Sequence, residues 1–184
     1  ERSRSWPVET HLIGDYNAPN VLAAICIGRH YHIADAVMAD AIGHYAPANS
    51  RSQFKDTGLN ELVLDAYNAN PTSMAAALEN FAKLPSGRKK LAIVGDMLEL
   101  GETSMAEHEA IVNLVKKLDL DTILVGPEFM KAAPEVSVRR FPDVAAAVEA
   151  LKAAKPKDQL ILVKGSRGIK LEEVSTSMTI NATA

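Results

Sequence analysis

The chain has 184 residues, of which 47% are hydrophobic and 23% are charged, and its formal net charge is -3. This balance excludes a disordered chain, and it lacks the basic excess with which proteins bind nucleic acids or anionic membranes. The single cysteine, Cys26, cannot build a disulfide framework or a cysteine-based metal site by itself. No apolar stretch reaches the roughly 20 residues that span a bilayer, and no export signal opens the chain. We therefore expect a globular, cytoplasmic protein of one domain, or of one domain and part of a second. We also expect it to be a monomer.

The first quarter of the chain reads as a short strand followed by two helices. The strand is predicted at residues 10–14, "THLIG", and apolar residues at helical spacing predict helices at 20–31 and 33–45. Pro19 suits the first turn of the first helix. The next stretch, "APANSRSQFKDTG", carries Pro, Asn, Ser and Gly that break all periodicity. We place a domain boundary there, between residues 1–50 and 51–184.

From residue 61 onward, apolar strands alternate with amphipathic helices. Strands are expected at 61–66, 90–95, 122–126, 136–141 and 159–165, and helices at 73–84, 104–118, 127–133 and 143–154. Ser104 and Glu107 fit a capping box at the start of one helix. Near-continuous apolar strands that alternate with helices predict an α/β fold: a Rossmann-like, mostly parallel sheet with helices on both faces. Ligands of such folds gather at the carboxyl ends of the strands.

Two of the turns at these strand ends carry conspicuous polar side chains. In "DAYNANP", Asp65 can accept hydrogen bonds from a ribose, and Asn68 and Asn70 can both donate and accept. The alternative is that Asn and Asp beside Pro only close the turn. In "VKGSRG", Lys164 and Arg167 could hold a carboxylate or phosphate, or they could simply be solvated.

A third turn, "GDMLELGE", places Asp96, Glu99 and Glu102 within one loop. Three carboxylates could bind a cation or an ammonium group, although acids at the start of a helix are commonly surface residues. The His residues lack zinc-ligand spacing, so we predict no metal site. The chain also contains no G-x-x-x-x-G-K-[ST] phosphate loop.

Five stretches together resemble the Mur ligases, and most closely their MurF type. They are "GDYNAPNVLAA" (14–24), "NSRSQ" (49–53), "LDAYNANPTSM" (64–74), "GDMLELGE" (95–102) and "LVKGSRGIKLEEV" (162–174). The resemblance runs from about residue 10 to residue 174, in the order and spacing of that family. It implies an ATP-dependent ligase that joins D-Ala-D-Ala to UDP-N-acetylmuramoyl-tripeptide in peptidoglycan precursor synthesis.

These ligases have an N-terminal domain for the UDP-sugar, a central ATP-binding domain and a Rossmann-like C-terminal domain. The resemblance implies that residues 1–50 are the helical end of the central domain and residues 51–184 the C-terminal domain. The phosphate loop and the Mg²⁺ ligands of the family would then lie outside this chain. The alternatives are an isolated module that only binds nucleotide or dipeptide, and a related Mur ligase for another amino acid.

The resemblance also assigns roles to individual residues on the ATP side. Its pattern places two adenine-contacting Asn residues at Asn17 and Asn20, with Tyr16 where the family has His. The arginine that reaches the terminal phosphate falls on Arg51, and the Asp that holds the ribose falls on Asp65. Tyr67 and Asn68 would lie along the nucleotide.

Charge complementarity suggests how the remaining polar residues would meet the dipeptide. Asp96 and Glu99 would face its ammonium group, and Lys164, Ser166 and Arg167 would face its carboxylate. No catalytic residue is assigned from the sequence.

Overall fold

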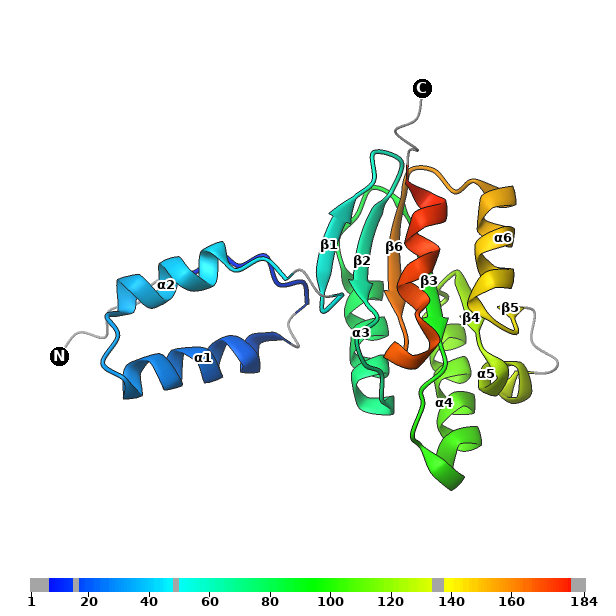
Figure 1. Ribbon diagram of the computed structural model, residues 1–184, viewed down its shortest axis with the longest axis horizontal. Helices are drawn as coiled ribbons and strands as arrows, with labels where there is room; N and C mark the ends of the chain where they lie inside the picture. Colours follow the sequence, from blue (N-terminus) through cyan, green and yellow to red (C-terminus); the bar gives the residue numbers. More distant parts are fainter. Residues whose placement is uncertain (1–6, 15–16, 48–49, 134–137, 180–184) are drawn as a thin grey trace.

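The computed structural model describes residues 7–14, 17–47, 50–133 and 138–179. It consists of a helical hairpin that projects from one side of a six-stranded sheet covered by helices (Figure 1). The hairpin comprises α1 (Ala18–His30) and α2 (Asp35–His44). Pro19 lies in the first turn of α1, as expected. The expected strand at 10–14 is absent, because these residues pair with no neighbouring strand.

The sheet has the strand order β1-β2-β6-β3-β4-β5. Its strands are β1 (Gln53–Asp56), β2 (Glu61–Asp65), β3 (Lys89–Gly95), β4 (Thr122–Val125), β5 (Arg139–Phe141) and β6 (Gln159–Lys164). All neighbours pair in parallel except β1, which runs antiparallel to β2. The predicted mostly parallel sheet is therefore confirmed. Strand β1 was not predicted, since its half-exposed residues show no apolar run.

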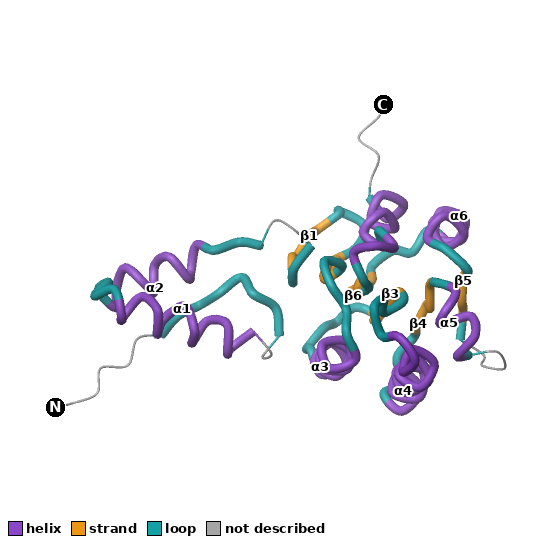
Figure 2. The backbone as a smooth tube through the Cα atoms, turned by 60° about the horizontal axis from the view of Figure 1, so that its bottom comes forward, coloured by secondary structure: helices purple, strands orange, loops and turns teal. Residues whose placement is uncertain are grey.

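Helices cover both faces of the sheet, as the apolar strands predicted (Figure 2). One face packs against α3 (Pro71–Lys83), α4 (Ser104–Lys117) and α5 (Pro127–Ala132). The other packs against α6 (Val144–Ala154) and the 3-10 helix η4 (Leu171–Met178). Two shorter 3-10 helices, η2 (Gly101–Thr103) and η3 (Arg167–Ile169), lie in turns after β3 and β6. Of the expected strand at 136–141, residues 136 and 137 lie outside the described residues, and β5 covers the end.

The capping box lies on a different helix from the one expected. Ser104 is already inside α4, whose N-cap Thr103 makes no side-chain cap bond. Instead Asn70 caps α3: its side chain accepts from the Ser73 N–H at 2.8 Å, and the Ser73 hydroxyl accepts from the Asn70 N–H at 3.2 Å. Asn70 thus closes its turn, which was the alternative to ligand binding.

The described part of the chain contains no helix that is both long and apolar enough to cross a membrane.

Candidate functional site

The candidate site lies where three parallel strands end side by side. Asp65 at the end of β2 is level with Lys164 at the end of β6, and Val94 near the end of β3 is level with the same Lys164. Because β6 lies between β2 and β3, the turns that follow these strands meet at one edge of the sheet. The sheet topology therefore brings together the three polar turns that the sequence analysis selected.

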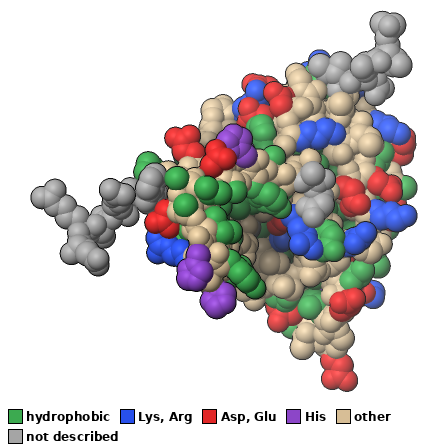
Figure 3. All heavy atoms as spheres, turned by 60° about the vertical axis from the view of Figure 1, so that its left-hand side comes forward, with side chains coloured by type: hydrophobic (Ala, Val, Ile, Leu, Met, Phe, Trp, Pro, Cys, Tyr) green, Lys and Arg blue, Asp and Glu red, His purple; other side chains and the backbone are tan. Residues whose placement is uncertain are grey.

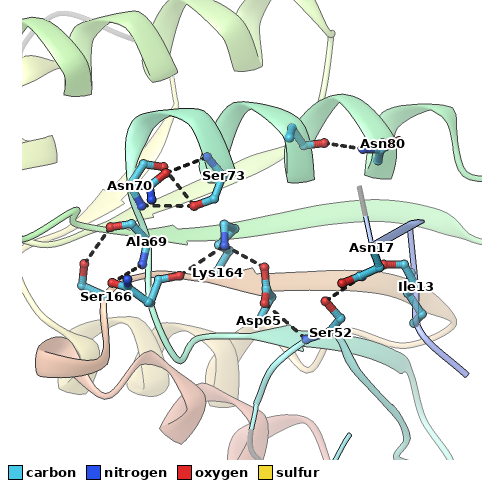
Figure 4. A network of polar contacts seen from close by, with 12 residues as sticks. Ile13, Asn17, Ser52, Asp65, Ala69, Asn70, Ser73, Asn80, Lys164 and Ser166 are labelled. Atoms are coloured by element: carbon cyan, nitrogen blue, oxygen red, sulfur yellow. Dashed lines mark hydrogen bonds and ion pairs between the residues drawn. The ribbon is translucent and has the colours of Figure 1, made fainter. Parts of the chain in front are cut away.

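An ion pair between Asp65 and Lys164 forms the centre of this edge (Figure 4). The Lys164 ammonium donates to Asp65 Oδ2 at 2.7 Å and to the Asn68 carbonyl at 3.3 Å. Asp65 Oδ1 accepts from the Ser52 N–H at 3.2 Å. The side chain of Lys164 is 2% exposed and that of Asp65 is 15% exposed. Of the two charged groups, only the carboxylate therefore has a surface toward a ligand.

Ser166 joins the three turns to one another. Its hydroxyl accepts from the Leu98 N–H at 2.9 Å and donates to the Ala69 carbonyl at 3.4 Å. Its backbone N–H donates to the Asp96 carbonyl at 3.1 Å. The side chain is buried, so in this structure Ser166 holds the turns in place and does not face the open surface where we expected it.

Two arginines converge on Tyr67. The Arg51 guanidinium carbon lies 3.6 Å from the centre of the Tyr67 ring, and that of Arg167 lies 5.1 Å away. A hydrogen bond from Arg51, together with the positive charges of both arginines, lowers the pKa of the Tyr67 phenol. The sequence analysis assigned Arg51 to a phosphate and Arg167 to a carboxylate. The structure places both guanidinium groups at a single aromatic ring, where they could bind anionic ligand groups.

The hairpin reaches this edge through Asn17. Its side-chain N–H₂ donates to the Ile13 carbonyl at 2.9 Å and to the Ser52 hydroxyl at 3.2 Å, and its Oδ1 accepts from Asn20 Nδ2 at 3.1 Å. Asn17 is buried, whereas Asn20 is exposed. A continuous line of polar contacts therefore runs from Asn20 through Ser52 to Asp65. Tyr16, the other residue that we considered in this segment, lies outside the described residues.

Asp96 differs from the expectation that it faces a ligand ammonium group. It is fully buried, and its two oxygens accept from the backbone N–H groups of Glu128 and Phe129, each at 2.9 Å. Burial raises the pKa of the Asp96 carboxyl, and the two N–H bonds partly oppose this. A side chain at Gly126 would collide with this carboxylate, which explains the glycine there. Asp96 therefore holds the start of α5 against the end of β3.

His108 has a structural role that the sequence analysis missed. It is fully buried, its Nε2 accepts from the Met97 N–H at 3.1 Å, and its Nδ1 lies 2.7 Å from the Ser104 carbonyl. These two contacts fix the neutral tautomer that carries the proton on Nδ1. No sequence signal identified this role, because a histidine inside an amphipathic helix is compatible with either face.

The remaining candidates, Glu99 and Asn68, are exposed. Glu99 has a φ of 66°, in the left-handed region, and follows the two residues whose N–H groups are held by His108 and Ser166. Asn68 Oδ1 accepts from the Ala69 N–H at 2.9 Å, so it also helps to close its own turn. Among the described residues, no group of three or more His, Cys, Asp or Glu side chains could hold a metal ion.

Comparisons with known proteins point to one family. The family described as "Mur ligase, glutamate ligase domain" matches residues 50–167. The UDP-N-acetylmuramoyl-tripeptide--D-alanyl-D-alanine ligases of Bacillus subtilis and Escherichia coli are 31% and 34% identical to the chain. The matches cover 89% and 94% of this chain but 38% and 39% of those ligases. The chain thus spans less than half the length of the curated relatives that it matches.

Solved structures agree with this result. A crystal structure of MurF from Acinetobacter baumannii superposes with a TM-score of 0.81 at 26% identity, covering 93% of this chain and 39% of that one. MurF from Thermotoga maritima in complex with ADP superposes with a TM-score of 0.75 at 23% identity, covering 91% and 38%. Because the identity to T. maritima MurF is only 23%, this superposition establishes a shared fold and nothing further.

Proposed function

This chain belongs to the Mur ligase family, and we propose that it is the carboxyl-terminal part of an ATP-dependent ligase that adds D-Ala-D-Ala to UDP-N-acetylmuramoyl-tripeptide. The observation that carries the proposal is the meeting of Asp65, Tyr67, Arg51 and Arg167 at one edge of the sheet. Such an edge offers an acceptor for a diol, an aromatic surface and two guanidinium groups for anions. ATP has a ribose diol, an aromatic base and anionic phosphates that match these protein groups. Because ATP is a cytoplasmic substrate, we place the reaction in the cytoplasm.

On the nucleotide side, we propose that Asp65, Arg51 and Asn20 contact ATP. Asp65 would accept hydrogen bonds from the ribose, and Arg51 would reach the terminal phosphate beside Tyr67. Asn20 is open to the adenine, whereas Asn17 is buried and would act by orienting Asn20. MurF from T. maritima, whose fold this chain shares, was crystallised in complex with ADP, and we propose a nucleotide as the ligand here as well.

On the dipeptide side, the proposal keeps only Glu99 and Arg167. Both are exposed, and they carry the charges that complement an ammonium group and a carboxylate. Asp96, Lys164 and Ser166 are buried, so they would support the site from behind.

The chemistry that these residues would support is amide formation through an acyl phosphate. The tripeptide carboxylate would take the γ-phosphoryl group from ATP and leave ADP. The dipeptide amine would then attack the carbonyl carbon, lose a proton and release phosphate, which leaves the amide. Water would destroy the acyl phosphate, so a separate domain that closes over it both protects it and orients the amine. Mg²⁺ would neutralise phosphate charge. The described residues lack a matching cluster of acids, so we propose that its ligands lie outside this chain.

We also propose the boundary at residues 50 and 51 as the junction between the end of a central domain and the C-terminal domain. The described part of residues 7–47 buries one large apolar side chain, Met38. It exposes several others, namely Leu22, Ile27, Tyr31, Ile33, Val37 and Tyr45. Figure 3, in which the side of the molecule that carries the hairpin faces the viewer, shows hydrophobic side chains gathered there. A hairpin with this surface suits packing against further parts of an ATP-binding domain.

The test is a ligase assay with a full-length protein that carries this segment, supplied with UDP-N-acetylmuramoyl-tripeptide, D-Ala-D-Ala and ATP. We expect D-Ala-D-Ala-dependent release of ADP and the corresponding amide product. Turnover with a different amino acid and not with D-Ala-D-Ala would leave the family intact but overturn the substrate. The isolated chain should give no product, because its sequence has no phosphate loop.

Asp65→Asn tests the nucleotide side in that protein. The amide keeps the shape of the side chain but removes its charge, so the Michaelis constant for ATP should rise about ten-fold, equivalent to about 1.4 kcal/mol. The constant for D-Ala-D-Ala should stay nearly unchanged. A lower melting temperature with an unchanged constant for ATP would show that Asp65 only closes the turn.

A further inference from the structure

We propose that Lys164 is a positioning residue for the nucleotide side of the site, acting through Asp65, and that it does not bind the dipeptide. The inference rests on the proposed function and deepens it. It assigns Lys164, in the "VKGSRG" turn, to the nucleotide, whereas the sequence analysis assigned it to the dipeptide carboxylate. The observation behind it is the ion pair between the ends of β2 and β6, in which Lys164 is buried and Asp65 is partly exposed.

The geometry leaves Lys164 no access to a ligand. Its side chain is 2% exposed, and its ammonium group is held by Asp65 Oδ2 at 2.7 Å and by the Asn68 carbonyl at 3.3 Å. Both acceptors belong to the β2 turn. To reach a dipeptide carboxylate, the lysine would have to leave them and strand the Asp65 carboxylate without its counter-charge, which is costly for a largely buried group.

The same geometry leaves Asp65 available. A carboxylate offers about four acceptor positions, and its two donors among the described residues are the Ser52 N–H on Oδ1 and Lys164 on Oδ2. These donors come from opposite sides of β2, since β1 and its preceding residues lie on one side and β6 on the other. Figure 4 shows these two contacts on the two oxygens of Asp65. Together they orient the carboxylate, whose side chain keeps 15% of its surface exposed for the remaining lone pairs to meet a diol.

Lys164 also positions the backbone of the β2 turn. Its bond to the Asn68 carbonyl spans 96 positions of sequence and lies one residue beyond Tyr67, the ring on which Arg51 and Arg167 converge. Loss of the ammonium group would therefore disturb the acceptor for the ribose and the Tyr67 ring against which Arg51 packs at 3.6 Å. Asp65 and Arg51 both belong to the nucleotide side of the proposed function.

A double-mutant cycle on the full-length ligase tests this inference. The variants are Lys164→Met, Asp65→Asn and the two combined, with Michaelis constants measured for ATP and for D-Ala-D-Ala. Lys90→Met is the matched control, because Lys90 lies on the neighbouring strand β3 and donates to the Ala82 carbonyl at 2.7 Å, near the opposite end of the sheet. ADP affinity of the same variants, measured by calorimetry, gives a readout besides activity.

Lys164→Met should raise the constants for ATP and ADP about ten-fold, the loss expected for one charge-assisted contact, and leave that for D-Ala-D-Ala nearly unchanged. In the Asp65→Asn background the same change should have little further effect on ATP, because the lysine acts through the missing charge. Lys90→Met should change neither constant.

Two results would overturn the inference. One is a rise in the D-Ala-D-Ala constant on Lys164→Met that persists with Asp65→Asn, since it would make Lys164 a dipeptide ligand. The other is an effect on ATP that is fully additive in the double variant. If Lys164→Met alone does not fold, comparing Asp65→Asn with the double variant still decides whether Lys164 binds the dipeptide, since a higher D-Ala-D-Ala constant in the double variant would overturn the inference. Absence of D-Ala-D-Ala addition by the unchanged ligase would instead defeat the proposed function.

Discussion

At the residue scale, the polar side chains of this edge divide into those that face one another and those that face outward. Lys164, Ser166 and Asp96 are buried and bind backbone groups or a carboxylate of neighbouring turns. Arg167 and Glu99 are exposed. This division follows from the cost of leaving a buried polar group without a partner, which is about 1–3 kcal/mol. The buried polar side chains at the strand ends therefore bind neighbouring protein groups, and the exposed ones remain free to bind a ligand.

The pKa of Tyr67 tests the arrangement of the two arginines. Arg51→Gln should raise the pKa of the phenol toward its ordinary value of 10.0, because the hydrogen bond and the charge of Arg51 are the main causes of its lowering. Ultraviolet titration of the chain measures this, and Tyr67→Phe identifies its contribution among the four tyrosines. Arg139→Gln, at an ion pair with Asp121, is the matched control. An unchanged titration in Arg51→Gln would show that Arg51 does not contact the ring in solution.

The buried Asp96 predicts a pH dependence of stability. Burial raises its pKa in the folded protein above the unfolded value of about 3.8, so the ionised carboxylate costs free energy of folding. The free energy of unfolding of the native chain, relative to Asp96→Asn, should decrease as the pH rises from about 3.8 through the raised pKa. Urea unfolding across this pH range measures the difference, with Asp121→Asn as a control for the loss of an exposed charge. An increase instead would mean that the N–H bonds from α5 outweigh burial.

At the scale of elements, the helix starts show how side chains define the turns of the site. Asn70 both ends the β2 turn and caps α3, so the first turn of α3 begins directly after the residues that carry Asp65 and Tyr67. The start of α4 lacks such a cap, and Ser104 instead donates to Glu128 Oε2 at 3.0 Å. The start of α4 is therefore held by a contact with α5, whereas the start of α3 is held by its own capping box.

Asn70→Ala should lower the free energy of unfolding by about 1 kcal/mol, the usual cost of removing an N-cap side chain. Asn80→Ala is the matched control, because Asn80 lies within the same helix and its side chain donates to the Ala76 carbonyl. Alanine is the better helix former there, so this variant should be neutral or slightly more stable. Denaturant unfolding of both variants checks the prediction. Equal losses of unfolding free energy in the two variants would show that the Asn70 cap does not stabilise α3.

At the scale of the whole molecule, the hairpin and the sheet differ in how much apolar surface they bury. The sheet has an apolar core on each face, whereas the described hairpin buries Met38 and little else. The two parts meet at residues 50–52, where Ser50 and Ser52 both have positive φ values and flank Arg51. The hairpin is therefore the less stable part of the isolated chain.

Limited proteolysis should remove the first 50 residues and leave residues 61–170 intact. A chain of residues 51–184 should retain the melting temperature of the sheet, since both of its cores lie within that range. Mass spectrometry of the fragments and calorimetry of the shortened chain measure these outcomes. First cuts inside residues 61–170 would show that the proposed boundary is misplaced.

Much of this architecture could be predicted from the sequence, because its signals are local. Runs such as "KLAIVG" and "QLILVK" are apolar over whole strands, and the intervening helices carry regular amphipathic spacing. Parallel strands then bring their carboxyl ends to one edge, so the polar turns after Asp65, Gly95 and Lys164 could be expected to meet there. Strand β1 escaped prediction because its pairing with β2 is not visible as an apolar run.

Only the tertiary structure decided which of these side chains bind one another. Asp65 and Lys164 are 99 positions apart, and their contact depends on the register between β2 and β6. The sequence alone is equally compatible with a Lys164 that pairs with Asp65 and with a Lys164 that faces solvent and binds a ligand. Burial selects between these arrangements, because a charge removed from water must be paired. By the same reasoning Asp96 binds the start of α5, while Arg51 and Arg167 remain at the exposed edge beside Tyr67.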